Sequence, residues 1–251
     1  MSIASDFEKD GYVVVATGLP EEVLDAARSA TGPLQPEGYH WSVWPRVFEG
    51  WKTSEAVRKV VYAEPVMEVL REIGGGEPRP SQTINFSGPS NQRLHQDGIH
   101  FQTWPRLGRM LGAWTALEDT DERNGTLAYV PGTHRLGHLD WQVLGFEKQK
   151  VNEQYDAYRK YEDRMEGLAL AYGGKRPFKA KKGETFVWGL EMLHGGWTPS
   201  EPTRTRHSMV THYFMPGCGR PWAPMFSDAR NGDFYWKSGK WFDREGVQRP
   251  L

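Results

Sequence analysis

The stretch Leu94-His95-Gln96-Asp97-Gly98 organises this chain, together with His194 far downstream. We expect residues 92–97 to be extended, and side chains on an extended segment alternate between two faces, so His95 and Asp97 point the same way. One imidazole from a later strand completes a set of two histidines and one carboxylate. Such a set covers one face of an octahedral iron ion and leaves the opposite face open. The pattern therefore predicts a non-haem Fe(II) site with ligands His95, Asp97 and His194.

The surroundings of His194 favour a metal ligand. This histidine follows an expected strand, Thr185–Leu190, in the stretch Leu193-His194-Gly195-Gly196. The two glycines allow backbone to approach a buried centre closely. His100 lies three positions after the aspartate, on the opposite face of an extended segment, and we do not expect it to bind metal. His134 stands in a turn sequence, where hydrogen bonds to local backbone are expected.

An arginine after His194 is a candidate anchor for a co-substrate. Thr205–Phe214 is expected to be a strand, on which Arg206 and Ser208 share a face. A guanidinium grips a carboxylate through two parallel hydrogen bonds, and a serine hydroxyl can add another. That pair suits the distal carboxylate of 2-oxoglutarate, whose keto-acid end would chelate the iron. Arg204 is the alternative on the same face, nearer the loop, and an ordinary ion pair is the alternative role if the metal set stood alone.

The front of the chain predicts one strand and two helical regions. The β-branched run at residues 11–16 favours a strand. Pro20-Glu21-Glu22 is typical of a helix start, with proline early and acids in the first turn. Thr53-Ser54 can cap a further helix, which Pro65 restarts and Gly74-Gly75-Gly76 ends.

After Pro80 the pattern changes to short extended runs separated by glycine, proline and asparagine. The expected strands are Gln82–Phe86, Gln92–Asp97, Met110–Leu117, Thr126–Val130, Thr185–Leu190 and Thr205–Phe214. Many short strands with turn signals between them suggest a β-sandwich or barrel. We therefore expect an α+β fold, mainly β, with N-terminal helices flanking one β core in a single domain over residues 1–251.

A helical insertion interrupts the strands at about residues 139–172. Within it, Glu147–Glu166 is rich in Lys, Glu, Gln, Tyr and Arg and has few aliphatic residues. This composition predicts a solvated helix. The helix is either a surface excursion or a lid over the site, since long insertions beside active sites often gate them.

Aromatic residues are the unusual feature of the composition, with 11 Trp in 251 residues. They gather in residues 39–51, which could form a wall of the core or contact a ligand directly. A second group near the C-terminus could close a cavity or form a dimer contact. This second group is Trp222, Phe234, Tyr235, Trp236, Trp241 and Phe242.

Charge and cysteine content limit the possible partners. The formal net charge of -1 gives no reason to expect a nucleic acid or an anionic membrane as partner. Cys218 is the only cysteine, which excludes an intrachain disulfide and fits a reducing cytoplasm. Residues 1–8 lack a basic region followed by an apolar run, so we expect no secretory signal. A monomer or homodimer in the cytoplasm is the expectation.

Taken in order, these motifs resemble those of the phytanoyl-CoA dioxygenase family over most of the chain. The matching stretches are Phe7-Glu8-Lys9-Asp10-Gly11-Tyr12-Val13-Val14, His95-Gln96-Asp97, Ala113-Trp114-Thr115-Ala116-Leu117-Glu118-Asp119, Asn124-Gly125-Thr126-Leu127, Pro131-Gly132-Thr133-His134-Arg135, His194-Gly195-Gly196 and Arg206-His207-Ser208. The stretch Gly195-Gly196-Trp197-Thr198 is bulkier than the family pattern. Nothing in the chain suggests a site for coenzyme A.

The resemblance implies a double-stranded β-helix core (a cupin-like jelly roll) with Fe(II), 2-oxoglutarate and O2 as cofactors. It implies His95, Asp97 and His194 as iron ligands and Arg206 as the 2-oxoglutarate anchor, with Trp114 near the co-substrate. The expected substrate is a small soluble metabolite, as in secondary metabolism. Candidates for the substrate pocket are Gln92, Trp104, Trp188 and Trp197, and candidates for recognition of an acidic group, or for surface salt bridges, are Arg79, Arg93, Arg109 and Arg220.

The expected reaction is hydroxylation of an unactivated C–H bond with release of succinate and CO2. Asp97 favours hydroxylation over halogenation, because related halogenases carry glycine or alanine at that position. Desaturation, epimerisation and cyclisation with the same cofactors are alternatives. Two further alternatives are a cupin-like metalloenzyme that does not use 2-oxoglutarate and a non-catalytic binding protein on the same scaffold.

Overall fold

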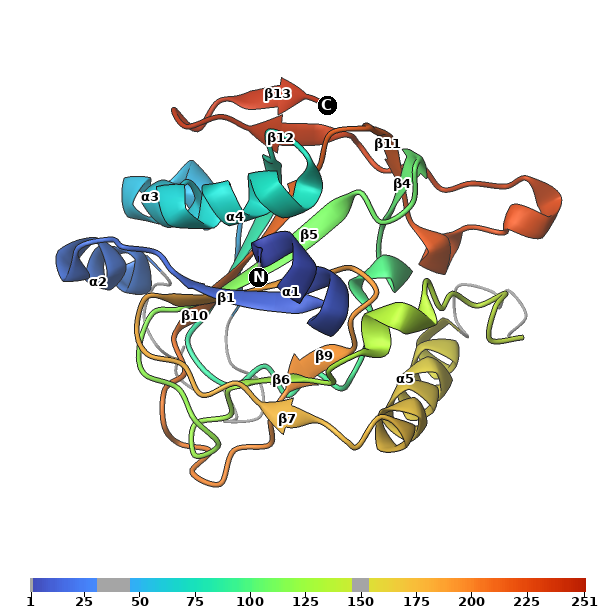
Figure 1. The fold of residues 1–251 in the computed structure, drawn as a ribbon, viewed down its shortest axis with the longest axis horizontal. Coiled ribbons are helices and arrows are strands. Elements are labelled where there is room, and N and C mark those ends of the chain that lie inside the picture. The colour runs from blue at the N-terminus through green and yellow to red at the C-terminus, as the bar shows by residue number, and fades with distance from the viewer. Residues whose placement is uncertain (1, 31–45, 146–153) are drawn as a thin grey trace.

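Runs of β-branched and aromatic residues build a six-stranded antiparallel sheet, which is the largest element of the fold (Figure 1). The computed structural model describes residues 2–30, 46–145 and 154–251. Across the sheet, the strands are β1 (Tyr12–Ala16), β8 (Glu184–Gly189), β5 (Met110–Ala116), β10 (Ser208–Phe214), β3 (Arg79–Phe86) and β2 (Arg46–Phe48). All residues of the central strand β5 are buried, as expected for a strand covered on both faces.

A smaller three-stranded sheet lies below the large one in the view of Figure 1. Its order is β7 (Arg176–Pro177), β6 (Leu127–Tyr129) and β9 (His194–Gly196). Two further antiparallel pairs are β4 (Gln102–Pro105) with β11 (Cys218–Trp222), and β12 (Lys240–Phe242) with β13 (Gln248–Pro250). The fold is thus mixed α and β, with antiparallel sheets throughout.

The N-terminal helices form as their start and stop signals predict. They are α1 (Ile3–Asp10), α2 (Glu21–Ser29), α3 (Glu55–Val61) and α4 (Glu64–Gly74). Ser54 caps α3, since its hydroxyl accepts a hydrogen bond from the amide of Val57. Gly75 ends α4 in the left-handed conformation, with φ of 72°. The buried faces of these helices pack against the large sheet in one apolar cluster, so full burial of a side chain such as Leu70 contributes about 1.5–3 kcal/mol.

Helix α5 (Gln154–Ala171) buries one row of side chains, although its composition is mostly polar. The stripe is Ala157, Tyr161, Met165 and Ala169, spaced four apart, and it packs against the segment that carries the predicted metal ligands. The predicted helix is confirmed, but it is solvated on one face only, because a few apolar side chains at the right spacing bury the other face. The first residues of the predicted helix, 147–153, lie outside the described part of the chain.

The stretch at 92–97 is not a strand. His95 makes a single antiparallel bridge to His194, and Asp97–Ile99 forms a short 3₁₀ helix. The backbone amides of Leu94 and Gln96 bond instead to side chains of α5, namely Glu166 and the Tyr161 hydroxyl. These side-chain partners satisfy the amides that a neighbouring strand would otherwise have bonded, so no ladder forms.

The described residues of the two aromatic-rich segments lie partly in the core and partly on the surface. Trp51 is buried and stacks on Phe242 with ring centroids 3.8 Å apart, which joins the C-terminal segment to the N-terminal helices. Phe48 is exposed, whereas Tyr39, Trp41 and Trp44 lie outside the described residues. Among the described residues, no helix is long and apolar enough to cross a membrane.

Candidate metal centre

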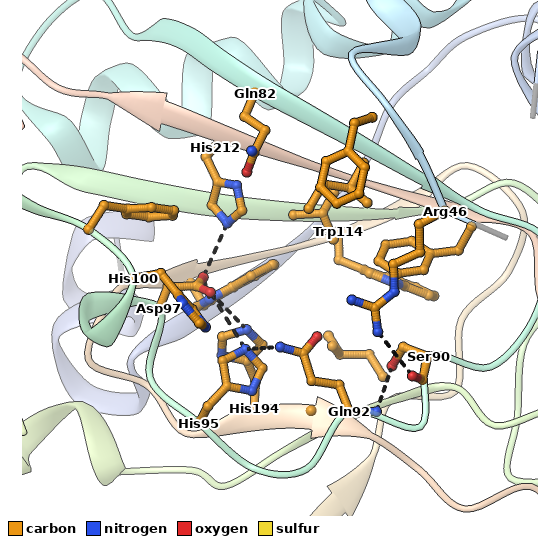
Figure 2. A pocket seen from close by; sticks show the side chains of 18 of the residues that line it. Arg46, Gln82, Ser90, Gln92, His95, Asp97, His100, Trp114, His194 and His212 are labelled. Atoms are coloured by element: carbon orange, nitrogen blue, oxygen red, sulfur yellow. Dashed lines mark hydrogen bonds and ion pairs between the residues drawn. The ribbon is translucent and has the colours of Figure 1, made fainter. Parts of the chain in front are cut away.

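Three buried side chains converge on one point, where β9 meets the short 3₁₀ helix. His95, Asp97 and His194 each offer one ligand atom, and these atoms all lie within 4.8 Å of one another. Figure 2 shows the three side chains pointing toward one another at one end of a cavity. The sequence predicted this convergence. His95 and Asp97 do not lie on one strand as expected, and a single backbone bridge between His95 and His194 brings the two histidines together.

The two histidines are held in the same tautomer, each by a hydrogen bond to a nearby backbone carbonyl. Nδ1 of His95 lies 2.8 Å from the carbonyl oxygen of Arg93, and Nδ1 of His194 lies 3.0 Å from that of Met192. A carbonyl can only accept, so both Nδ1 atoms carry the proton and donate it. The lone pair of each Nε2 therefore faces the cavity, where that of His95 accepts from the Gln92 amide and would pass to a metal when one binds. The two Nε2 atoms lie 3.7 and 3.5 Å from Oδ1 of Asp97.

Asp97 is oriented by two donors on its other oxygen. Trp188 Nε1 lies 3.0 Å from Oδ2 and His212 Nε2 lies 3.3 Å from it. With Oδ2 engaged, Oδ1 faces the two imidazoles. Burial raises the pKa of the Asp97 carboxyl, but the positive charges that His194 and His212 carry when protonated, together with hydrogen bonds from both rings, outweigh burial and hold this pKa well below its usual value. The carboxyl is therefore ionised, as a metal ligand must be.

The donor set fits a divalent first-row metal. Two neutral imidazole nitrogens and one carboxylate oxygen on one side of a cavity match the facial arrangement of non-haem Fe(II) sites. Gln92, a predicted pocket residue, lies beside this set, with its amide nitrogen 3.0 Å from His95 Nε2. His100 is not part of the set. Burial lowers the pKa of His100 to about 3, and its Nε2 lies 3.2 Å from the Tyr158 hydroxyl.

Arg206 is buried at another part of the same cavity, with an exposed fraction of 2%. Its Nη1 donates to the Ser208 hydroxyl at 2.7 Å, and its guanidinium lies 5.8 Å from the ring centre of Trp114 and 5.2 Å from that of Phe86. Within the described residues its Nε has no hydrogen-bond partner and no carboxylate lies within ion-pair distance of it, although the charge of Glu118 acts on it from farther away. Burial lowers the pKa of Arg206 to about 9, so it stays charged at neutral pH.

The choice of Arg206 over Arg204 agrees with the geometry. Arg204 is partly exposed and pairs with Glu201 at 3.4 Å, which is the ordinary ion pair considered as an alternative. Arg206, in contrast, is a buried cation that forms no ion pair with a described carboxylate, and Glu118 is the one anion that acts on it from a distance. A buried charge is costly unless it is paired, so Arg206 has the capacity to pair with an anion that enters the cavity.

The cavity has a volume of about 750 Å³, within the range of small-molecule sites. Gln92, Trp114 and Trp188 line it as predicted. Trp104 and Trp197 do not, which corrects the prediction for both. Trp104 is 56% exposed on β4. Trp197 follows His194 by three positions, an odd offset that turns its side chain away from the metal side, toward Lys175.

Several lining residues escaped the sequence analysis. They are contributed by strands, by loops, by α5 and by the short 3₁₀ helix Pro224–Phe226: Arg46, Phe48, Gln82, Ile84, Phe86, Ser90, His100, Phe101, Leu127, Tyr158, Val210, His212, Met225, Phe226 and Lys237. Val210 and His212 carried a usable signal, because strand alternation places both on the face of Arg206 and Ser208. Phe48 belongs to the aromatic group at residues 39–51, for which contact with a ligand was an alternative. The four arginines considered for an acidic substrate group lie elsewhere. For example, Arg93 pairs with Asp163 at 2.7 Å, and Arg109 bonds the carbonyl oxygens of Gly74 and Pro216.

Fold and site together define a class: a mixed α and β protein with antiparallel sheets and a two-histidine, one-carboxylate metal site beside a small-molecule cavity. Residues 7–205 match the model of the family described as Phytanoyl-CoA dioxygenase (PhyH). The chain belongs to this family.

The curated relatives are longer than the region they share with this chain. "Phytanoyl-CoA dioxygenase domain-containing protein 1" of Mus musculus is 27% identical over 182 residues, which cover 66% of this chain and 55% of that protein. "Phytanoyl-CoA dioxygenase, peroxisomal" of Rattus norvegicus is 30% identical over 132 residues, covering 51% and 35%. The chain thus spans about half the length, or less, of these relatives.

Solved structures resemble this chain in fold. The carbocyclase SnoK from nogalamycin biosynthesis has a TM-score of 0.65 at 17% identity, covering 86% of this chain and 84% of its own. EctD from S. alaskensis, with 2-oxoglutarate and 5-hydroxyectoine, has a TM-score of 0.60 at 18% identity, covering 90% and 79%. Both similarities concern the fold, since the sequences have diverged widely.

Proposed function

We propose that this chain is a non-haem Fe(II)- and 2-oxoglutarate-dependent dioxygenase that hydroxylates an unactivated C–H bond of a small metabolite, with release of succinate and CO2. One observation carries the proposal. A buried His95–Asp97–His194 set and a buried, anion-free Arg206 line the same cavity. A metal and a carboxylate of one chelating ligand would satisfy both at once.

The fold supports the same proposal. We take the six-stranded and the three-stranded antiparallel sheets as the two sides of a double-stranded β-helix, the jelly roll of cupin-like oxygenases. The structural neighbours are described as 2-oxoglutarate-dependent enzymes or bind 2-oxoglutarate. In this arrangement β9 and the 3₁₀ helix supply the metal ligands, and β10 supplies Ser208 and positions Arg206 just before it.

In the proposed reaction the chain's own residues hold and orient the reactants. His95, His194 and Asp97 would hold iron through Nε2, Nε2 and Oδ1. Arg206, steadied by Ser208, would hold the distal carboxylate of 2-oxoglutarate beside Trp114. When bound, the metal and the keto acid supply the oxidising power that inserts an oxygen atom from O2 into a C–H bond. The aromatic walls exclude water and orient the substrate.

Other reactions use the same cofactors, and an assay of the products distinguishes them from hydroxylation. The neighbouring structures include the epimerase SnoN and the carbocyclase SnoK, at 18% and 17% identity. We favour hydroxylation over halogenation because Asp97 occupies the position where a halide would need space. Mass spectrometry of products separates a gain of one oxygen from a loss of two hydrogens or an unchanged mass. We also propose a cytoplasmic monomer or homodimer, which gel filtration and cell fractionation would test.

The metal assignment is tested with Asp97→Ala. We expect this variant to lose at least about tenfold in Fe(II) affinity and to release no succinate, because one ligand of three is gone. The control is Asp156→Ala, which removes an exposed carboxylate on α5. Calorimetric titration with Fe(II) without oxygen and a succinate assay are the measurements. Succinate release at the wild-type rate in Asp97→Ala would remove Asp97 from the metal set.

The co-substrate assignment is tested with Arg206→Met. We expect the apparent KM for 2-oxoglutarate to rise roughly 10- to 100-fold, because a charge-assisted pair is lost. Arg204→Met is the matched control and should keep the wild-type KM. A visible absorption band on mixing Fe(II) and 2-oxoglutarate anaerobically is the direct readout of chelation. A wild-type protein without such a band would instead favour a metalloenzyme that does not use 2-oxoglutarate.

A further inference from the structure

The cavity has a second cationic side chain, Lys237, that the proposed chemistry does not use. Lys237 belongs to the C-terminal segment, beyond the residues that match the family. Its position is fixed by backbone. The amide of Lys237 donates to the carbonyl oxygen of Pro221 at 3.0 Å, and Trp222 forms an antiparallel bridge with Trp236. The ammonium is therefore presented to the cavity by a paired loop and not by a free tail.

The ammonium of Lys237 has no anionic partner among the described residues. Its recorded contact is with the ring of Phe101, 4.9 Å from Nζ to the ring centre. The attraction between a cation and an aromatic face offsets only part of the loss of hydration. Burial lowers the pKa of Lys237 to about 8, against the opposing field of Asp97. Once Asp97 is committed to a metal, Lys237 is left as a partly buried cation with capacity for an anion.

Lys237 lies away from the co-substrate anchor. The ring of Phe101, over which Lys237 lies, packs against His212, with centroids 4.9 Å apart. His212 is four residues beyond Ser208 on β10, or about 13 Å along the strand. Figure 2 shows His212 and Trp114 on different sides of the cavity, with Arg46 beyond Trp114. Arg46 and Arg206 both lie near Phe86, so they belong to the co-substrate end.

Apolar side chains accompany Lys237 at the metal end. The short 3₁₀ helix Pro224–Phe226 contacts the 3₁₀ helix that begins at Asp97, and it contributes Met225 and Phe226 to the cavity wall. Phe226 is 42% exposed, and its ring lies tilted against that of Tyr235 with centroids 5.4 Å apart. This end thus offers one positive charge and an apolar surface next to the metal ligands.

Resting on the proposed function, we propose that the primary substrate is a small organic anion whose carboxylate or phosphate group binds Lys237. Its apolar part then lies against Phe101, Met225 and Phe226, within reach of the metal. The specificity of the enzyme thus comes from the C-terminal segment outside the shared family region, while the family region supplies the three metal ligands.

The test is a binding experiment on the whole protein that does not require turnover. The protein is loaded with Zn(II) and saturating 2-oxoglutarate, so that the Arg206 end is occupied and no oxidation occurs. Calorimetry then compares matched pairs: hexanoate with hexanamide, benzoate with benzamide, and phenyl phosphate with phenol. We expect an anion to bind at least tenfold more tightly than its neutral partner, and the three pairs distinguish a carboxylate from a phosphate.

Variants assign the effect to Lys237. Lys237→Met, of similar length and without charge, should abolish the preference for the anion, a loss of roughly 10- to 100-fold. Lys237→Arg should retain most of the preference. Lys240→Met is the control, since Lys240 is an exposed residue of β12 that does not line the cavity, and it should bind as the wild type does. Thermal melting of each variant checks that it is folded.

The inference is overturned if no anion exceeds its neutral partner tenfold in the wild type, or if Lys237→Met keeps the preference. Failure of the proposed function has a different signature. In that case wild-type protein and Lys240→Met would not bind Zn(II) with 2-oxoglutarate, and with Fe(II) they would release no succinate under any condition.

Discussion

At the scale of single residues, the metal site depends on which atom of each ligand is already engaged. Both histidines donate from Nδ1 to a carbonyl oxygen two residues earlier, and Asp97 accepts two hydrogen bonds on Oδ2. Each ligand therefore presents one defined atom to the cavity. Such supporting bonds fix the orientation of ligands before a metal binds, which lowers the entropy lost on binding.

Trp188→Phe tests this orientation of Asp97. The substitution keeps the aromatic wall and removes the N–H that bonds Oδ2 at 3.0 Å. We expect metal affinity to fall roughly 10- to 100-fold, and the free energy of unfolding to fall by about 1 kcal/mol. Titration with Co(II), followed by its visible spectrum, measures the affinity. Trp104→Phe, at an exposed position outside the cavity, is the control. Equal Co(II) affinity in Trp188→Phe and wild type would show that Trp188 does not orient the ligand.

At the scale of elements, α5 does more than cover the surface. It supplies hydrogen-bond acceptors to the segment that carries His95 and Asp97, through Glu166 and the Tyr161 hydroxyl. Its Tyr158 lines the cavity. Whether α5 also opens and closes as a lid stays a prediction, but its apolar stripe anchors it to the core beside the metal ligands.

Tyr161→Phe separates the role of the hydroxyl from that of the helix. The ring and its packing remain, but the buried amide of Gln96 loses its acceptor, at a cost of about 1–3 kcal/mol in stability. Because Gln96 lies between two metal ligands, we also expect weaker metal binding. Urea denaturation with and without Zn(II) measures both effects, and Tyr172→Phe at the exposed end of the region serves as control. A variant with wild-type stability and metal affinity would contradict this role for α5.

At the scale of the whole molecule, the C-terminal segment contacts both the N-terminal helical layer and the cavity. Phe242 is fully buried against Trp51, at the start of the N-terminal helical layer. The same segment, earlier in its course, provides Met225, Phe226 and Lys237 to the cavity. The predicted aromatic group at the C-terminus therefore packs in part as core, and none of its six members lines the cavity.

Phe242→Ala should destabilise the protein by about 3–5 kcal/mol, because a large buried side chain is replaced by a cavity. Tyr235→Ala, at a residue that is 56% exposed, should change the free energy of unfolding by far less. Chemical denaturation followed by tryptophan fluorescence gives both values. A cost below 1 kcal/mol for Phe242→Ala would mean that the C-terminal segment is not part of the cooperative core.

The sequence by itself determined that His95, Asp97 and His194 come together, and it determined the helix caps and most strands, because these depend on spacing and local periodicity. It did not determine that His95 meets His194 through one bridge, that Trp188 and His212 engage Asp97, or that Lys237 enters the cavity. Those contacts join segments far apart in the chain, and only the pairing of strands and packing of loops brings them together. A periodic pattern predicts which face of its own element a side chain lies on. Which residue it contacts on a distant element depends on how the strands pair and the loops pack in the tertiary structure.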